Sequence, residues 1–275
     1  MRRLAALLLC ACMLSGCQAA AEAPEAQTAP VSTTSTAASA DPLETAAALS
    51  KAYGIQILVG EDAVKTEPWD YRFTPETDPR ILTEALEELE LRLSVYPTGM
   101  LPVLNEDCGG LHICIVKEIL GNENNGSLAA ARGLQFRDEE NQYYLVLAED
   151  ITYTLYHELC HVIEDYLAPR IKTWGRWEQL NPPDFFYDWS YQANQLRDGS
   201  LWLQEGSRAF VDTYSMSFPR EDRARIMEYA MTEGHEQLFE SPIMQEKLAL
   251  LSEGIREGFG LQDSPRVFLW EQYLK

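Results

Sequence analysis

The sequence has few basic residues. Lys and Arg together number 22 against 43 Asp and Glu, so the formal net charge is -21 at pH 7. Proteins that bind nucleic acids neutralise phosphates with basic side chains, and this composition therefore argues against a nucleic-acid partner. Glycine and proline, at 16 and 14 of 275 residues, are not enriched, which excludes collagen-like chains. Apolar residues make up 46% of the chain, enough for a folded core.

The chain also lacks an apolar run long enough to cross a membrane. Two arginines near the N-terminus precede a short apolar run over residues 4–14, followed by Ser15, Gly16 and Cys17. A membrane-spanning helix needs about 20 apolar residues, whereas a basic start and a short apolar run are typical of a signal peptide. The sequence Leu-Ser-Gly-Cys at residues 14–17 resembles the lipobox of bacterial lipoproteins. That resemblance implies cleavage before Cys17 and acylation of Cys17; the alternative is an ordinary secreted protein.

Three regions follow from this N-terminus: a signal peptide over 1–16, the lipidated Cys17 with a tether over 17–41, and a folded domain over 42–275. Residues 18–40 are dominated by Ala, Thr, Ser, Pro and Glu and include no aromatic residue, so they cannot bury enough surface to offset the entropy of ordering. Because the body is acidic, membrane attachment would depend on acyl chains. We expect a monomer on the extracytoplasmic side of a bacterial cell membrane.

Cysteine is scarce in the predicted domain. Of six cysteines in the chain, only Cys108, Cys114 and Cys160 lie beyond residue 17. An odd number cannot all pair within one chain. The spacing of Cys108 and Cys114 is compatible either with a disulfide or with two separate thiols.

The hydrophobic pattern of the domain predicts an α+β fold without a regular strand-helix-strand rhythm. Asp78-Pro79 opens a helix with apolar residues at helical spacing up to Leu93, and its glutamates form the solvated face. The remaining expected elements are helices over 42–53 and 151–167, and strands over 55–58, 111–116 and 143–147.

The strongest chemical signal lies in the helix predicted over 151–167. It is His157-Glu158-Leu159-Cys160-His161, in which two histidines four residues apart share one helix face and can reach one metal ion. Glu158 is placed one step around the helix to accept a proton from a metal-bound water. Cys160 is interpreted as a small apolar filler, because a thiolate would close the position that water needs. The alternative is a pair of histidines packed in the core.

A catalytic zinc ion needs a third protein ligand. The position six residues after His161 is a leucine, so the histidine-rich metzincin pattern is absent. Surface or turn positions are expected for His112 and His235. A carboxylate remains, and Glu205 and Glu221 compete for the role because their spacing from His161 does not decide between them.

The segment around Glu221 resembles the zinc-metallopeptidase clan that includes anthrax lethal factor and the Pro-Pro endopeptidases. In that clan a downstream helix carries Glu-x-x-Ala, and a tyrosine precedes the glutamate by seven residues. Here Ala224 and Tyr214 stand at those positions. The section over 210–222 also resembles zinc-binding metallopeptidase lipoproteins of bacteria. Members of the clan often carry an acidic residue four positions after the ligand, where this chain has Arg225. Either Asp222 orients a ligand histidine instead, or Glu221 is not the third ligand.

The resemblance implies a zincin-like fold of the gluzincin type with a small mixed sheet, and Zn²⁺ held by His157, His161 and Glu221. Glu158 would then move the proton of a zinc-bound water during peptide hydrolysis, and Tyr214 would stabilise the oxyanion. For Tyr214 the alternative is a half-buried helix tyrosine. Asp165 and Asp212 are candidates for contacting the ligand histidines, with solvent exposure as their alternative.

Aromatic residues crowd the segment between the two metal-binding stretches. Most of them are expected in a core under a long loop, with a few exposed rings lining a cleft. They are Trp174, Trp177, Phe185, Phe186, Tyr187, Trp189, Tyr191 and Trp202. The predicted function is a membrane-anchored zinc metallopeptidase acting on peptide or protein substrates. The competing hypothesis is a non-catalytic, zinc-containing binding lipoprotein.

Overall fold

The computed structural model describes residues 10–11, 41–68, 70–122, 128–148, 151–191 and 198–275. Cys17 and nearly all of the predicted signal peptide and tether lie outside these residues. Within the described part of the chain, no helix has the length and apolar character that crossing a bilayer requires.

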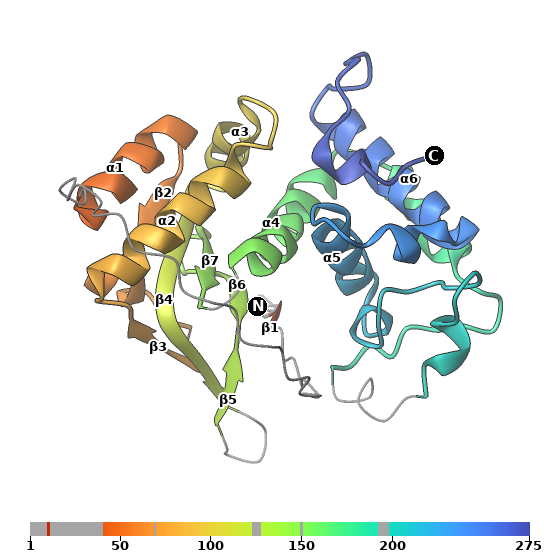
Figure 1. The fold of residues 1–275 in the computed structure, drawn as a ribbon, viewed down its shortest axis with the longest axis horizontal. Coiled ribbons are helices and arrows are strands. Elements are labelled where there is room, and N and C mark those ends of the chain that lie inside the picture. The colour runs from red at the N-terminus through yellow and green to blue at the C-terminus, as the bar shows by residue number, and fades with distance from the viewer. Residues whose placement is uncertain (1–9, 12–40, 69, 123–127, 149–150, 192–197) are drawn as a thin grey trace, which may run out of the picture.

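A mixed sheet forms one half of the molecule (Figure 1). Its main path runs in the order β1-β6-β7-β4-β2, with β2, β4 and β7 mutually parallel and β6 antiparallel to β7. β3 and β5 both pair with the far end of the long strand β4. The strands are β1 (Cys10–Ala11), β2 (Gln56–Leu58), β3 (Tyr71–Pro75), β4 (Leu111–Asn122), β5 (Leu128–Ala131), β6 (Gly133–Arg137) and β7 (Tyr143–Leu147). The expected combination of helices with a mixed sheet is confirmed.

Three of the helices begin and end close to where local sequence signals place them, over 42–53, 79–93 and 151–167. Asp41 and Asp78 cap the first two by accepting hydrogen bonds from backbone N–H groups in the first turn, and a proline follows each cap. The α-helices are α1 (Pro42–Tyr53), α2 (Pro79–Leu93), α3 (Met100–Asp107), α4 (Ile151–Leu167), α5 (Pro219–Ala230) and α6 (Pro242–Gly258). Short 3-10 helices are η1 (Gly60–Val64), η2 (Thr173–Leu180), η4 (Ser200–Trp202), η5 (Tyr214–Met216), η6 (Glu236–Glu240) and η7 (Leu269–Glu271).

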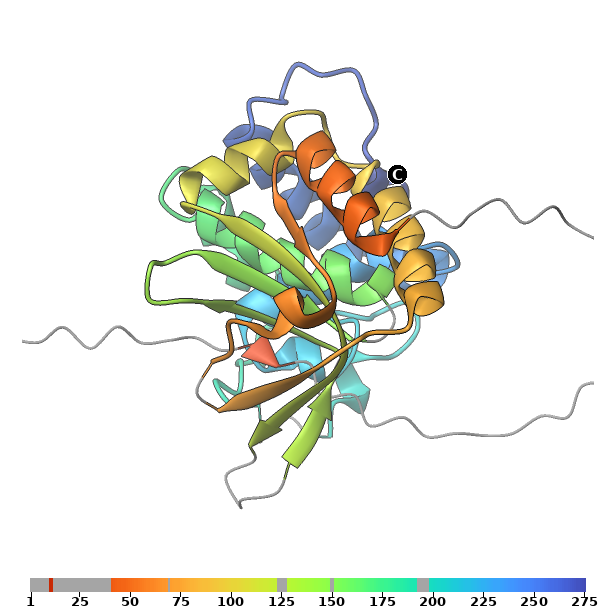
Figure 2. The ribbon, with the colours of Figure 1, turned by 90° about the vertical axis from the view of Figure 1, so that its left-hand side faces the viewer.

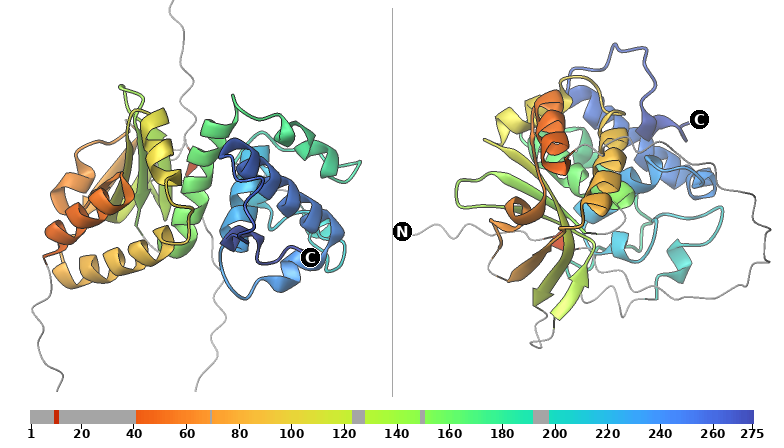
Figure 3. Two further views of the ribbon diagram at one scale, coloured as in Figure 1. Left: turned by 90° about the horizontal axis from the view of Figure 1, so that it is seen from above. Right: turned by 60° about the vertical axis from the view of Figure 1, so that its left-hand side comes forward.

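Helix α4 lies at the centre of the molecule, between the sheet and the C-terminal helices α5 and α6 (Figures 1 and 3). One face of the sheet shares a large apolar core with α1 to α4, and this core continues into α5 and α6. The other face carries a smaller apolar cluster that includes β3 residues. The strands of the sheet can be followed in Figure 2. The central position of α4 explains why so many of its residues, polar ones included, are buried.

The three cysteines of the domain are buried free thiols. Cys108 belongs to the large core and Cys114 to the cluster on the opposite face of the sheet, so the structure has two separate thiols at these positions and no disulfide. Cys160 is fully buried in the large core, in keeping with its interpretation as an apolar filler. Burial raises the pKa of both Cys114 and Cys160 to about 12, which keeps them protonated.

Strand β6 approaches α4 unusually closely, and Gly133 is the reason. A Cβ atom at Gly133 would lie 2.0 Å from Cγ2 of Thr154 and 3.1 Å from Oε1 of Glu158. Only glycine therefore allows this contact. The start of β6 is thereby placed directly beside the Glu158 side chain.

Candidate metal centre

Helix α4 and the first turn of α5 bring three potential metal ligands together. His157 and His161 lie one turn apart on α4, and Glu221 faces them from α5. The Nε2 atoms of the two histidines are 3.2 Å apart. Oε2 of Glu221 lies 3.2 Å from Nε2 of His157 and 3.5 Å from Nε2 of His161. All three side chains are at least 99% buried.

These distances match the requirements of a tetrahedral metal site. Zinc binds histidine nitrogen and carboxylate oxygen at about 2.1 Å, so two ligands of a tetrahedron lie about 3.4 Å apart. The three separations in this protein fall within a few tenths of an ångström of that value. Three ligands of this type also leave a fourth position for water, as in a catalytic zinc site.

Glu221 is the carboxylate that the structure places in this cluster. Its second oxygen, Oε1, accepts a hydrogen bond of 2.8 Å from the hydroxyl of Tyr191. Burial raises the pKa of Glu221, but the adjacent imidazoles outweigh this effect and hold the pKa well below its usual range. The competing Glu205 is exposed and accepts a hydrogen bond from Gln237 instead.

Glu228 contacts the ring nitrogen of His157 that does not face Glu221. Nδ1 of His157 lies 3.0 Å from Oε2 of Glu228, which lets Nδ1–H donate to the carboxylate and makes Nε2 the nitrogen that would bind a metal. The expectation that Asp222 orients a ligand histidine is wrong. Asp222 instead accepts hydrogen bonds from Trp177, Tyr187 and Lys247 within the core behind α5.

Arg225 holds the Glu228 carboxylate in place. Its Nη1 lies 2.6 and 2.5 Å from the two oxygens of Glu228, and its Nη2 lies 2.5 Å from Oδ2 of Asp212. Asp212 therefore does not touch a histidine directly but acts through Arg225. The sequence does contain a signal for the role of Glu228. Residues seven apart lie on the same face of a helix, and Glu228 follows Glu221 by seven residues.

His161 has a different neighbour. Nε of Arg220 lies 3.3 Å from Nδ1 of His161, so the guanidinium donates to that nitrogen and the proton of the neutral ring resides on Nε2. Burial and the charge of Arg220 lower the pKa of His161 to about 4. Metal binding through Nε2 would require this contact to loosen. Asp165, the second candidate for contacting a histidine, is partly exposed and binds Arg137 and Tyr143.

The two predicted catalytic residues flank this cluster. Glu158 is fully buried next to Gly133 of β6. Tyr214, in η5, is half-buried, and its ring centroid lies 6.2 Å from that of His157. The remaining histidines lie elsewhere: His112 stacks on Tyr144, and His235 lies 3.3 Å from the hydroxyl of Tyr153.

The aromatic segment divides into a core part and an exposed part, as its composition suggested. Trp177, Phe185 and Tyr187 are buried in the large core. Phe186 and Trp189 are exposed. Tyr191, which sequence analysis did not single out as a site residue, contacts the candidate metal ligand Glu221.

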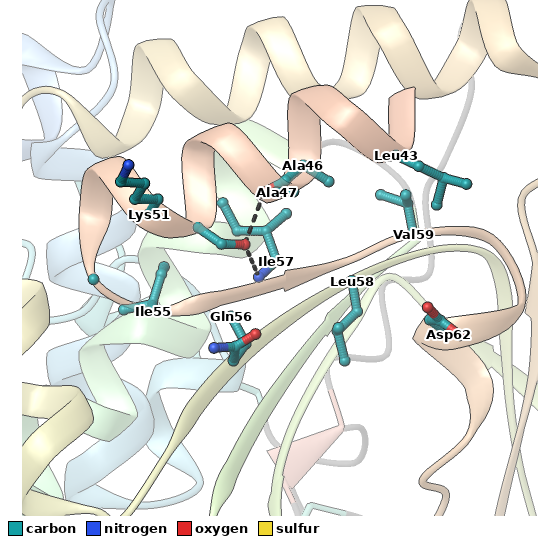
Figure 4. Close-up of a pocket in the computed structure, with 12 residues that line it drawn as sticks. Leu43, Ala46, Ala47, Lys51, Ile55, Gln56, Ile57, Leu58, Val59 and Asp62 are labelled. Carbon is teal, nitrogen blue, oxygen red and sulfur yellow. Dashed lines mark hydrogen bonds between the residues drawn. The ribbon is translucent and has the colours of Figure 1, made fainter. Parts of the chain in front are cut away.

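A separate cavity of about 490 Å³ lies between α1 and β2, at the opposite edge of the sheet from β6 (Figure 4). Apolar side chains such as Leu43 and Val59 line much of it. The amide of Ile57 donates to the Ser50 hydroxyl, and the amide of Ile55 donates to the Ser50 carbonyl. The Ile57 bond satisfies an outward-facing donor of β2, which makes this edge less available to an added strand.

Comparison with known proteins gives little on which to argue function. No family model matches the chain, and no curated protein does either. Among solved structures, the chain is similar to one from Bacteroides caccae described as a "putative zinc-binding metallo-peptidase". The match has 16% sequence identity and a TM-score of 0.49, and covers 86% of this chain and 90% of that one.

Proposed function

We propose that the protein is a zinc-dependent metallopeptidase. The single observation that carries this proposal is the arrangement of His157, His161 and Glu221, whose ligand atoms lie 3.2 to 3.5 Å from one another in a buried cluster. Two imidazoles and one carboxylate are the donor set of catalytic zinc sites in peptidases such as thermolysin.

A bound zinc ion would supply a Lewis acid and a strongly acidified water. The protein's own residues provide the rest of the chemistry. Glu158 follows the ligand His157 directly in α4 and is buried, so it would accept a proton from the attacking water and deliver it to the leaving amine. Tyr214 would donate its phenol hydrogen to the carbonyl oxygen as negative charge develops there.

A peptide substrate also needs a surface to bind, and strand β6 can provide one. In the structure β6 pairs on its outer side with the extended dipeptide β1, with Cys10 opposite Gln135 and Ala11 opposite Leu134. The outer side of β6 is thus able to form antiparallel backbone pairs. Because Gly133 at the start of β6 lies against Glu158, a peptide added to this strand would pass beside the proposed catalytic carboxylate.

The lipid anchor at Cys17 and the extracytoplasmic location remain part of the proposal, supported by the N-terminal sequence alone. Incorporation of a radiolabelled fatty acid into wild type, and its absence from Cys17→Ser, would test the anchor. Equal labelling of the two proteins would overturn it.

The decisive experiment for catalysis compares wild type with Glu158→Gln, which removes the proton acceptor and preserves side-chain volume. Both proteins are expected to bind one zinc ion, and only wild type should cleave a peptide library. If wild type binds zinc but cleaves nothing, the non-catalytic binding lipoprotein becomes the better hypothesis. If Glu158→Gln cleaves as fast as wild type, the assigned role of Glu158 is wrong.

A further inference from the structure

Four ring contacts connect the candidate metal centre to an exposed tryptophan. The ring centroids of His157 and Tyr214 are 6.2 Å apart, and those of Tyr214 and Tyr191 are 5.8 Å apart. The next two steps, from Tyr191 to Phe218 and from Phe218 to Trp189, are 4.7 and 5.9 Å. We call Tyr214, Tyr191, Phe218 and Trp189 the aromatic wall. It is a series of neighbouring aromatic rings that begins at the candidate metal ligand His157.

The outer end of the wall is held in an unfavourable backbone conformation. Trp189 has a φ of 53°, in the left-handed region that residues with a Cβ rarely adopt. Two backbone hydrogen bonds fix it there: the Trp189 amide donates to Ser217, and the Asp188 amide donates to Met216. Strained positions of this kind persist where the surrounding structure imposes them, and they concentrate at ligand-binding sites.

Trp189 is also unusually exposed for its position. Its side chain is 65% exposed, although Tyr187, two residues earlier, is only 5% exposed within the core. A large apolar ring in water forgoes the free energy of burial, and such rings at a site mark surfaces that bind another molecule. Strain and exposure therefore coincide at one residue, which lies on a wall that leads to the metal centre.

We propose that the aromatic wall is a substrate subsite that binds an aromatic side chain of the peptide, with Trp189 as its specificity-determining residue. This inference rests on the proposed function, because continuity with the metal centre is what identifies the occupant as a peptide. An extended peptide advances about 3.4 Å per residue, so about seven residues cover the longest path that the four ring contacts allow. The aromatic side chain therefore lies within about seven positions of the scissile bond.

The test uses the full-length protein loaded with zinc, and dye-labelled octapeptides of Gly, Ala and Ser in which one phenylalanine occupies each position in turn. Four proteins are compared: wild type, Trp189→Ala, Trp189→Phe and Phe186→Ala. Phe186 is the matched control, because it is a neighbouring exposed aromatic residue, 76% exposed, that is not one of the four rings of the wall. Thermal unfolding establishes that each variant is folded.

Wild type is expected to cleave its preferred phenylalanine peptide about tenfold faster, in kcat/KM, than the same peptide with alanine, the size of effect that one aromatic pair and its buried area provide. Trp189→Ala should lose this preference and cleave the phenylalanine and alanine peptides with equal kcat/KM. Trp189→Phe should restore most of the preference, and Phe186→Ala should keep all of it. An unchanged preference in Trp189→Ala would overturn the inference.

Failure of the proposed function would be visible separately. If wild type cleaves none of the peptides, the peptidase proposal fails, and fluorescence anisotropy of the same labelled peptides then decides the subsite. Tighter binding of a phenylalanine peptide to wild type than to Trp189→Ala would preserve it as a binding surface. Equal affinities of the phenylalanine peptide for the two proteins would rule out the aromatic subsite.

Discussion

Replacing Glu228 tests how the protein orients its first ligand histidine. Glu228 is 4% exposed and faces two groups, Nδ1 of His157 at 3.0 Å and the guanidinium of Arg225. Glu228→Gln removes the negative charge. It also replaces one acceptor oxygen with an NH2 group, which then faces the N–H of either His157 or Arg225. Glu228→Ala removes both contacts and leaves His157 without the acceptor that fixes its ring.

Loss of a carboxylate behind a ligand histidine lowers metal affinity by roughly 10- to 100-fold. We expect about 10-fold weaker zinc binding in Glu228→Gln and close to 100-fold in Glu228→Ala. The buried Arg225 would also lose one ion-pair partner but keep Asp212, so the loss of stability should be smaller than the roughly 3–5 kcal/mol that follows when a buried charge is left unpaired. The double variant Glu228→Gln with Arg225→Gln removes both charges of this pair and should not recover zinc affinity.

Competition with a zinc-binding fluorophore at fixed pH measures the affinity, and thermal unfolding of the metal-free proteins measures stability. Glu233→Gln serves as the control, since Glu233 is an exposed glutamate five residues further along the chain. Zinc binding by Glu228→Ala as tight as that of wild type would refute the reasoning. Recovery of zinc affinity in the double variant would refute it as well, because the loss would then be an effect of Arg225.

Three further predictions concern neighbours of the site. Gly133→Ala should destabilise the protein by about 1–3 kcal/mol, and Thr154→Ala should partly restore stability, as measured by urea unfolding; no loss would contradict the close approach of β6 to α4. Arg220→Met should tighten zinc binding roughly fivefold or more, because it removes a cation and a donor that face His161; weaker binding would show that Arg220 supports the site. Burial raises the pKa of Asp212, but Arg225 and Ser215 outweigh burial and lower it below the usual value. Asp212 therefore stabilises the fold fully above its unfolded pKa of about 3.9, and the stability gap between wild type and Asp212→Asn should shrink as the pH falls through the lower folded pKa; a gap that widens in acid would contradict this sign.

Local sequence signals located several elements almost to the residue. The predicted helices over 42–53 and 151–167 match the bounds of α1 and α4, and the predicted strand over 143–147 matches β7. Each of these segments has caps, a turn or a clear periodicity of its own. Strand β6, with the sequence Gly-Leu-Gln-Phe-Arg, has no such pattern and was not expected. It is a strand because α4 and β7 pack against it.

The candidate site likewise has one part that local sequence predicts and one part that it does not. The spacing of His157 and His161 within one helix predicts a shared face, because helical geometry alone determines it. Which distant side chains complete the site depends on how α5 packs on α4. Glu228 lies 71 residues from His157 in sequence, and Tyr191 lies 30 residues from Glu221, so neither contact follows from local spacing. The acidic residue nearest in sequence, Asp222, points into a different part of the core.

Metal content of the purified protein tests the central claim most directly. Elemental analysis after dialysis against zinc should find one tightly bound ion per chain in wild type. Glu221→Ala and His157→Ala should each lose most of it, whereas Glu205→Ala, at the exposed glutamate, should retain it. A wild-type protein that neither contains nor takes up a transition metal would contradict the account, and so would full zinc occupancy in Glu221→Ala.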